Sequence, residues 1–149
     1  MPFHMAYDEV YHHEFQLQEF QYFVVIDFEA TCDKVDGGVS LSKALFMHDK
    51  WLRERGVKHT SFTIVIWTDW DCRTMLESEC RLKGIYKSPY IDRWINLKVS
   101  FHEIFGRVRC NLKEAVQLDG LTWEGIAHCS LDDARNTAQL LINLTRRGF

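Results

Sequence analysis

Two short apolar runs on either side of a helical segment constrain the fold more than any other feature of this sequence. Residues 22–28 (YFVVIDF) and 61–67 (SFTIVIW) are rich in β-branched and aromatic residues, the composition of strands buried on both faces. The segment between them has helical periodicity, with Ser40 placed to cap its start and Gly56 placed to stop it. Its buried face is expected to contain Leu41, Ala44, Leu45, His48 and Leu52. Strand, helix and strand in this order predict two parallel strands with a right-handed crossover.

The rest of the chain continues this α/β pattern. We expect a helix over 72–83 that ends before Gly84, a short strand near 95–98, and a helix over 111–118 with a capping box. The last helix is expected to start after Ser130, as its N-cap, and to end near Arg146. Its apolar face would contain Leu131, Ala134, Ala138, Leu141 and Leu144.

The chain has the length of one domain. Its 149 residues favour a single domain over 21–149, preceded by a polar arm over 1–20 that is rich in His, Gln and Glu. A net charge of −3 excludes a strongly basic protein that binds nucleic acid through its overall field. The longest apolar stretch, residues 22–26, is too short to cross a bilayer, and the N-terminus has no legible targeting signal. We expect an intracellular protein, cytoplasmic or nuclear, with an organelle as the alternative, and no membrane partner.

Two carboxylates stand at the carboxyl end of the first expected strand. Asp27 and Glu29 are two residues apart, so their side chains point to the same face of the strand. Ligands in open α/β sheets bind at the carboxyl ends of the strands, and hard divalent cations prefer oxygen ligands. The pair is therefore either half of a Mg²⁺ or Mn²⁺ site or two solvated acids at the end of a strand.

Three more polar residues lie at ends of expected elements. Asp71 follows the second strand, so it can approach Asp27, although an Asp there also suits a helix N-cap. His128 precedes the last helix, and Asp133 lies in that helix's first turn, where an acid also suits the helix dipole. A His beside several carboxylates is what a metal-assisted hydrolase uses to activate water, and two metals can clamp the two oxygens of phosphodiester cleavage.

Five stretches resemble the DEDDh 3′→5′ exonucleases, and within them the enhancer-of-RNA-interference (ERI) type exoribonucleases, with the closest wording in plant members. They are DFEATC (27–32), WTDWDCRTMLESEC (67–80), RWINLK (93–98), NLKEAVQLDGLTWEG (111–125) and AHCSLDDARNTAQLL (127–141).

The resemblance implies an RNase H-like DEDD exonuclease fold and a role for each polar residue. Asp27, Glu29, Asp71 and Asp133 would hold two Mg²⁺ ions, with Mn²⁺ as the alternative, and Glu29 would share in catalysis. His128 would be the general base, while Glu29, Ala30 and His128 would contact the terminal nucleotide. The family pattern selects Asp133 as the acid, five residues after His128, and not the adjacent Asp132.

This chain departs from the family between Lys34 and Val35. In the family, two further strands and a helical segment follow the first acidic motif, whereas here residues 34–39 lead directly to the helix that begins after Ser40. The resemblance therefore implies a truncated fold, a mixed sheet that lacks two antiparallel strands. Without those strands, residues 22–28 would form an exposed apolar edge that could pair with another chain.

The function that follows is Mg²⁺-dependent 3′→5′ exoribonuclease activity on single-stranded RNA ends or overhangs, with release of 5′-mononucleotides. Small regulatory RNA and ribosomal RNA are both suggested as substrates by the family. The alternative is a catalytically impaired form that acts as an RNA-binding or protein-binding module and self-associates through the exposed strand.

Overall fold

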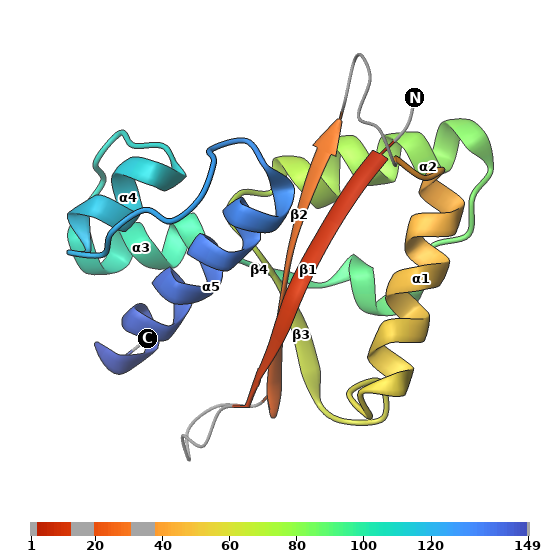
Figure 1. The fold of residues 1–149 in the computed structure, drawn as a ribbon, viewed down its shortest axis with the longest axis horizontal. Coiled ribbons are helices and arrows are strands. Elements are labelled where there is room, and N and C mark those ends of the chain that lie inside the picture. The colour runs from red at the N-terminus through yellow and green to blue at the C-terminus, as the bar shows by residue number, and fades with distance from the viewer. Residues whose placement is uncertain (1–2, 13–19, 31–37, 149) are drawn as a thin grey trace.

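Four strands form one mixed sheet at the centre of the molecule (Figure 1). The computed structural model describes residues 3–12, 20–30 and 38–148, and within these it describes the side chains of residues 20–28 and 38–148. The strand order is β1 (Phe3–His12), β2 (Tyr22–Ala30), β3 (Phe62–Ile66) and β4 (Trp94–Asn96). β2, β3 and β4 are parallel, and β1 is antiparallel to β2. The expected α/β fold with a mixed sheet is confirmed.

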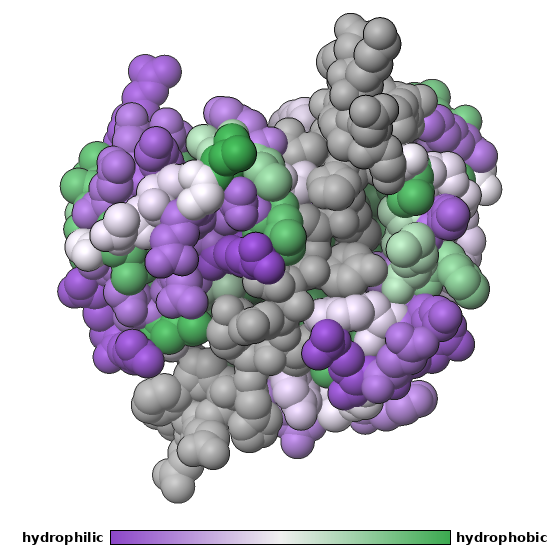
Figure 2. All heavy atoms as spheres, in the orientation of Figure 1, coloured by the Kyte–Doolittle hydropathy of each residue, from purple (hydrophilic) through white to green (hydrophobic). Residues whose placement is uncertain are grey.

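Helices cover both faces of this sheet (Figure 1). One face packs against α1 (Leu41–Glu54), the π-helix η1 (Trp70–Leu76), α2 (Glu77–Lys83) and the 3₁₀ turn η2 (Pro89–Asp92). The other face packs against α3 (Leu97–Phe105), α4 (Leu112–Leu118) and α5 (Ser130–Arg146). Hydrophilic side chains cover much of the outer surface of both layers in the view of Figure 2.

β2 is buried on both faces, as its composition predicts. Val24 and Ile26 enter the core on the α1 side, while Phe23 and Val25 enter the core on the α5 side. Successive side chains of a strand point in opposite directions, so a strand between two helical layers must be apolar at every position. β3 pairs with it in parallel, with Tyr22 opposite Phe62 and Val25 opposite Val65.

α1 follows the sequence pattern closely. The hydroxyl of Ser40 accepts a hydrogen bond from the backbone N–H of Lys43, which caps the helix. Gly56 then takes a left-handed backbone with φ of +69°, a conformation that glycine adopts at little cost. The buried residues of α1 are the five expected ones, Leu41, Ala44, Leu45, His48 and Leu52.

Three element boundaries differ from the sequence expectation. The helix expected over 72–83 begins two residues earlier, as the π-helix η1, and continues as α2 to its predicted end at Gly84. The strand expected over 95–98 ends at Asn96, whose side chain caps α3, so Lys98 is helical. α5 starts at Ser130 with Cys129 in the N-cap position, so Ser130 is not the cap. The capping box of α4, formed by Asn111 and Glu114, is confirmed.

The N-terminal segment is the largest difference. Residues 1–20 were expected to be a polar arm, but Phe3–His12 forms β1 and pairs along β2, with Phe3 opposite Ala30 and His12 opposite Tyr22. The prediction that residues 22–28 form an exposed edge of the sheet is therefore wrong, because β1 pairs along that side of β2. An edge strand can be polar, since its backbone groups make the pairing, and this explains why its composition gave no strand signal.

Two further points complete the fold. The turn expected over 33–38 lies outside the described residues except for Gly38, and so does the junction between Lys34 and Val35. Within the described ranges, no helix is both long and apolar enough to span a membrane.

Candidate functional site at the carboxyl ends of the parallel strands

A cleft of about 720 Å³ opens where β2 and β3 end. Its lining includes four of the residues singled out in the sequence, namely Asp27, Asp71, His128 and Asp133. They come from β2, η1, the loop before α5, and α5 itself, so the fold gathers residues that are up to 106 positions apart in the chain. The juxtaposition expected at this edge of the sheet is therefore observed.

Asp71 reaches the cleft because of the way η1 begins. The N-cap position belongs to Asp69, whose side chain does not cap the helix but accepts a hydrogen bond from the indole N–H of Trp94 at 2.8 Å. That bond ties the start of η1 to β4. Asp71 lies in the first turn and only 9% of it is exposed, so it is a buried cleft acid and not the cap that its position also allowed.

His128 and Asp133 are joined through the backbone. The N–H of His128 donates to Oδ1 of Asp133 at 3.1 Å. His128 has a φ of +67°, and it is the non-glycine residue with a left-handed backbone among those described. This conformation is uncommon for a residue with a Cβ and costs about 1–2 kcal/mol, so surrounding contacts must hold it. The side chain of His128 is exposed at the cleft, where solvent and substrate can reach it.

Asp133 is itself in an unusual environment for a carboxylate. It is 9% exposed, and burial raises its pKa, while the N–H of His128 and the His128 side chain oppose that rise. A carboxylate that burial disfavours as an anion gains from a nearby positive charge. Such a group is suited to hold a cation.

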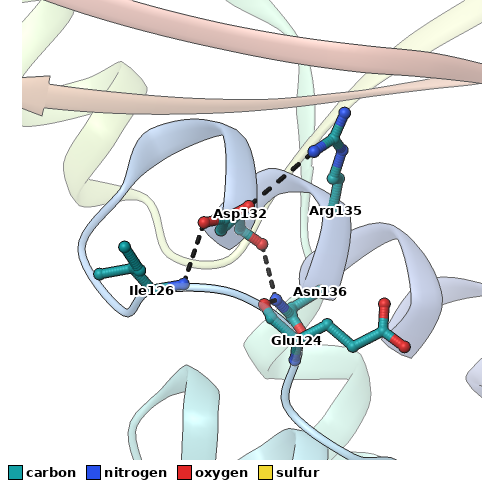
Figure 3. Close-up of polar contacts among 5 residues, drawn as sticks. All are labelled: Glu124, Ile126, Asp132, Arg135 and Asn136. Carbon is teal, nitrogen blue, oxygen red and sulfur yellow. Dashed lines mark hydrogen bonds and ion pairs between the residues drawn. The ribbon is translucent and has the colours of Figure 1, made fainter.

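The neighbouring Asp132 points to a different place (Figure 3). Its Oδ2 accepts a hydrogen bond from the N–H of Ile126 at 2.9 Å, and its Oδ1 lies 3.9 Å from the guanidinium of Arg135. Gly125 has a φ of +85° and passes so close that a Cβ there would overlap the Asp132 carboxylate. Asp132 therefore fastens the loop that carries His128, while Asp133 lines the cleft.

Asn136 is the second fastening of this loop (Figure 3). Its amide donates to the carbonyl oxygens of Glu124 and Asp132, both at 2.7 Å, and its Oδ1 accepts from the N–H of Glu124 at 3.1 Å. It is only 3% exposed. Sequence reasoning missed Asn136; a polar residue on the buried face of α5 was the signal that could have shown it.

Glu29 and Ala30 can be placed by backbone alone. They lie at the end of β2, opposite His4 and Phe3 of β1, and their side chains lie outside the described part of the structure. Their expected contacts with a metal and a nucleotide stay predictions.

The acids of the cleft fit a divalent cation in kind. Asp27, Asp71 and Asp133 offer carboxylate oxygens, which Mg²⁺ and Mn²⁺ prefer. Among the side chains that the structure describes, however, no three His, Cys, Asp or Glu residues converge closely enough to hold an ion. The metal site therefore stays a prediction, in which Glu29 would complete the set.

The cleft also contains two cations that sequence reasoning did not single out. Lys98 lies in the first turn of α3, and Arg109 lies in the loop between α3 and α4. Lys98 was present in the RWINLK motif, but the expectation of a strand there gave no reason to place it at the cleft.

The chain is similar to known exonucleases in sequence and in fold. The RNase_T family model, described as Exonuclease, matches residues 28–141. The 3′-5′ exonuclease Snipper of Drosophila melanogaster is 33% identical over 128 residues, covering 76% of this chain and 45% of that protein. ERI1 exoribonuclease 3 of Homo sapiens is 27% identical over 195 residues, covering 91% of this chain and 57% of that protein. The chain thus spans about half the length of these curated relatives.

The comparison with solved structures shows the fold. The nuclease domain of 3′hExo, described as a DEDDh family member bound to rAMP, superposes with a TM-score of 0.70 at 16% identity over 99% of this chain and 93% of that chain. The alignment with ERI1 exoribonuclease 3 is longer than this chain of 149 residues, so that relative carries residues that this chain lacks. These relatives are animal proteins, and the expected closeness to plant members stays a prediction.

Proposed function

The chain belongs to the RNase_T exonuclease family, among the DEDDh exonucleases of ERI type, and on this premise we propose that it is a 3′→5′ exoribonuclease. Its substrate would be the 3′ end of single-stranded RNA or a short overhang, and its product a 5′-mononucleotide. The names of the relatives support exonuclease and exoribonuclease activity, and the rAMP bound to the nuclease domain of 3′hExo supports an RNA nucleotide in the cleft. The 3′ ends of small regulatory RNA and of ribosomal RNA are the proposed biological targets.

The observation that carries this proposal is the shared cleft. Asp27, Asp71, His128 and Asp133 come from four separate segments and line one space. Each residue alone could be explained by a structural role, such as a helix cap or a solvated acid at the end of a strand. Separate structural roles of this kind give no reason for the four side chains to line one cleft.

His128 is the group that would take the proton from the attacking water. Its side chain is exposed at the cleft, and its unusual backbone is held by Asp133 on one side and by the fastened loop on the other. A histidine can accept a proton near neutral pH and release it to solvent afterwards. Two divalent cations, when bound, would supply the positive charge that offsets the phosphate and activates the water. Asp27, Asp71 and Asp133, together with Glu29, would hold them.

The test is degradation of a 5′-labelled single-stranded RNA with Mg²⁺, with chelator, and by Asp133→Ala protein. We expect a ladder that shortens from the 3′ end with Mg²⁺, and none with chelator or with the variant. Glu54→Gln is the matched control, because Glu54 is an exposed carboxylate on α1. Far-UV circular dichroism of the variant should match the wild type. Undiminished hydrolysis by folded Asp133→Ala protein would contradict the proposed function.

The second candidate is a binding module without hydrolytic activity, as an RNA-binding or protein-binding form of the family. It is favoured by the residues that this chain lacks relative to ERI1 exoribonuclease 3. RNA binding without hydrolysis, by protein that is folded, would favour this second function.

A further inference from the structure

A second groove of about 630 Å³ adjoins the cleft on the side of α3. It is lined by α3 and by the loop that follows it, residues 106–110. Lys98 and Arg109 line both the groove and the cleft, so the two spaces meet at these side chains. A molecule that extends out of the cleft past Lys98 and Arg109 enters this groove.

The groove is positively charged in a protein whose net charge is negative. Lys98, Arg107 and Arg109 line it, and Glu103 is its carboxylate. Within the described side chains, none of the three cations has a carboxylate oxygen within ion-pair distance. By contrast, Arg53, Arg81 and Lys83 on the other helical layer each pair with a carboxylate one turn away. Cations without carboxylate partners are available to a bound anion.

The loop that carries the two arginines is held in place before any ligand arrives. α3 ends at Phe105, and the C-cap residue Gly106 has a φ of +84°. The ring Nε2 of His102 donates to the carbonyl oxygen of Val108 at 3.1 Å, and the N–H of Val108 donates to the carbonyl oxygen of Gly106 at 2.9 Å. These bonds fix the backbone on both sides of Arg107, and Arg109 directly follows the bonded residue Val108. Binding at this loop would therefore cost less ordering entropy than binding at a free loop.

Lys98 is anchored as well. Its backbone N–H donates to the carbonyl oxygen of Trp67 at 3.0 Å, and its ammonium lies 6.0 Å from the centre of the Trp67 ring. Trp67 follows β3 and lines the cleft. The ammonium is thus held at the boundary between the acidic cleft and the basic groove.

We propose that this groove binds the sugar–phosphate backbone of the RNA strand on the 5′ side of the nucleotide held in the cleft. The proposal rests on the proposed function, because it takes the cleft as the site of the 3′-terminal nucleotide. Asp27, Asp71 and Asp133 repel phosphates, so an approaching strand needs positive charge beside them. Contacts to phosphates position a strand without reading its sequence, which suits an enzyme that removes one nucleotide after another.

The experiment measures RNA affinity separately from hydrolysis. The probe is a 5′-fluorescein 12-nucleotide RNA with phosphorothioate linkages at its 3′ end to prevent degradation, and the readout is fluorescence anisotropy with Mg²⁺ from 50 to 200 mM salt. We compare wild type with the double variant Arg107→Gln/Arg109→Gln. Lys43→Gln is the control, because Lys43 is an exposed cation on α1, on the opposite face of the sheet.

We expect the double variant to bind the 12-nucleotide RNA several-fold more weakly than wild type and the control. The slope of log affinity against log salt should become shallower by roughly 1.4, since each neutralised phosphate of a single strand contributes about 0.7. The ratio of kcat/KM for a 12-nucleotide RNA to kcat/KM for a dinucleotide should also fall, because a dinucleotide does not fill the groove.

The outcomes separate the two proposals. Unchanged RNA affinity and an unchanged salt slope in folded double-variant protein would overturn the proposal that the groove binds RNA. An equal loss of RNA affinity in Lys43→Gln would overturn it as well. Wild-type protein that hydrolyses no RNA, yet binds it through Arg107 and Arg109, would overturn the proposed function and support the groove.

Discussion

The helical layers on the two faces of the sheet are built in different ways. The α1 layer consists of an amphipathic helix with a standard cap, exposed ion pairs one turn apart, and an apolar core. The α3–α5 layer carries a left-handed histidine, a buried asparagine with three hydrogen bonds, and a buried aspartate paired with an arginine. The ion pairs of the first layer lie mostly within one helical turn, whereas in the second layer buried polar side chains hold the loop before His128 and the start of α5 beside the cleft. We expect mutations in the two layers to differ in their effects on activity and on stability.

The largest expected effect concerns Asn136, which should control activity more than stability. Asn136→Ala removes the hydrogen bonds that hold Glu124 and the loop before His128. A displacement of about 1 Å of a reacting group can cost about 100-fold in rate, so we expect a fall of that order in kcat. Steady-state hydrolysis of labelled RNA measures it. Gln139→Ala, an exposed position on the same helix, is the control and should retain activity. Equal kcat values for the two variants would show that the loop keeps its position without the hydrogen bonds of Asn136.

The second prediction compares ion pairs on the two layers. Arg147 lies 2.9 Å from Oδ1 of Asp119, whose side chain is fully buried. Arg147→Ala leaves that carboxylate buried without its half-exposed cation, so we expect a loss of about 1–3 kcal/mol in the free energy of unfolding. On α1, Lys50 and Glu54 are both more than half exposed, and Glu54→Gln should cost less than about 0.5 kcal/mol. Urea denaturation measures both, and similar losses would remove this distinction between the layers.

The third prediction concerns the pH dependence of protein stability that arises from His48 in the α1 layer. His48 is fully buried, and burial lowers its pKa to about 4, against a smaller opposing effect of Asp49. Its Nδ1 lies 3.1 Å from the hydroxyl of Tyr90. Because the unfolded chain binds this proton near pH 6.5 and the folded chain near 4, the stability that neutral His48 contributes is complete above 6.5. It is lost as the pH falls from 6.5 toward 4, by roughly 3 kcal/mol in all.

The measurement is urea denaturation from pH 7.5 to 4 of wild type and His48→Gln. The difference between the two should change across this window and be constant above it. His59→Gln, at an exposed histidine, serves as the control. A difference that does not depend on pH would show that His48 is not the group responsible.

Much of the candidate site could be predicted because each piece lies at the end of an element with a local signal. Periodicity placed Asp27 at the end of β2 and Asp71 after β3, and parallel strands then required both to lie at one edge. The orientation of Asp132 could not be predicted in this way. Asp132 and Asp133 are adjacent acids in one helical turn, and only the position of the 124–128 loop decides which of them faces the cleft.

The fold shows the same division. The βαβ unit, the Ser40 cap, the glycine stops and the Asn111 capping box were determined by the sequence alone, because spacing and caps act over a few residues. Only the tertiary structure decided that Phe3–His12 is a strand and that Lys98 and Arg109 join a groove to the cleft. The physical reason is sequence distance. Strand pairing and the gathering of charges at a surface depend on segments that lie far apart in the chain, and no local sequence pattern shows which segments will meet.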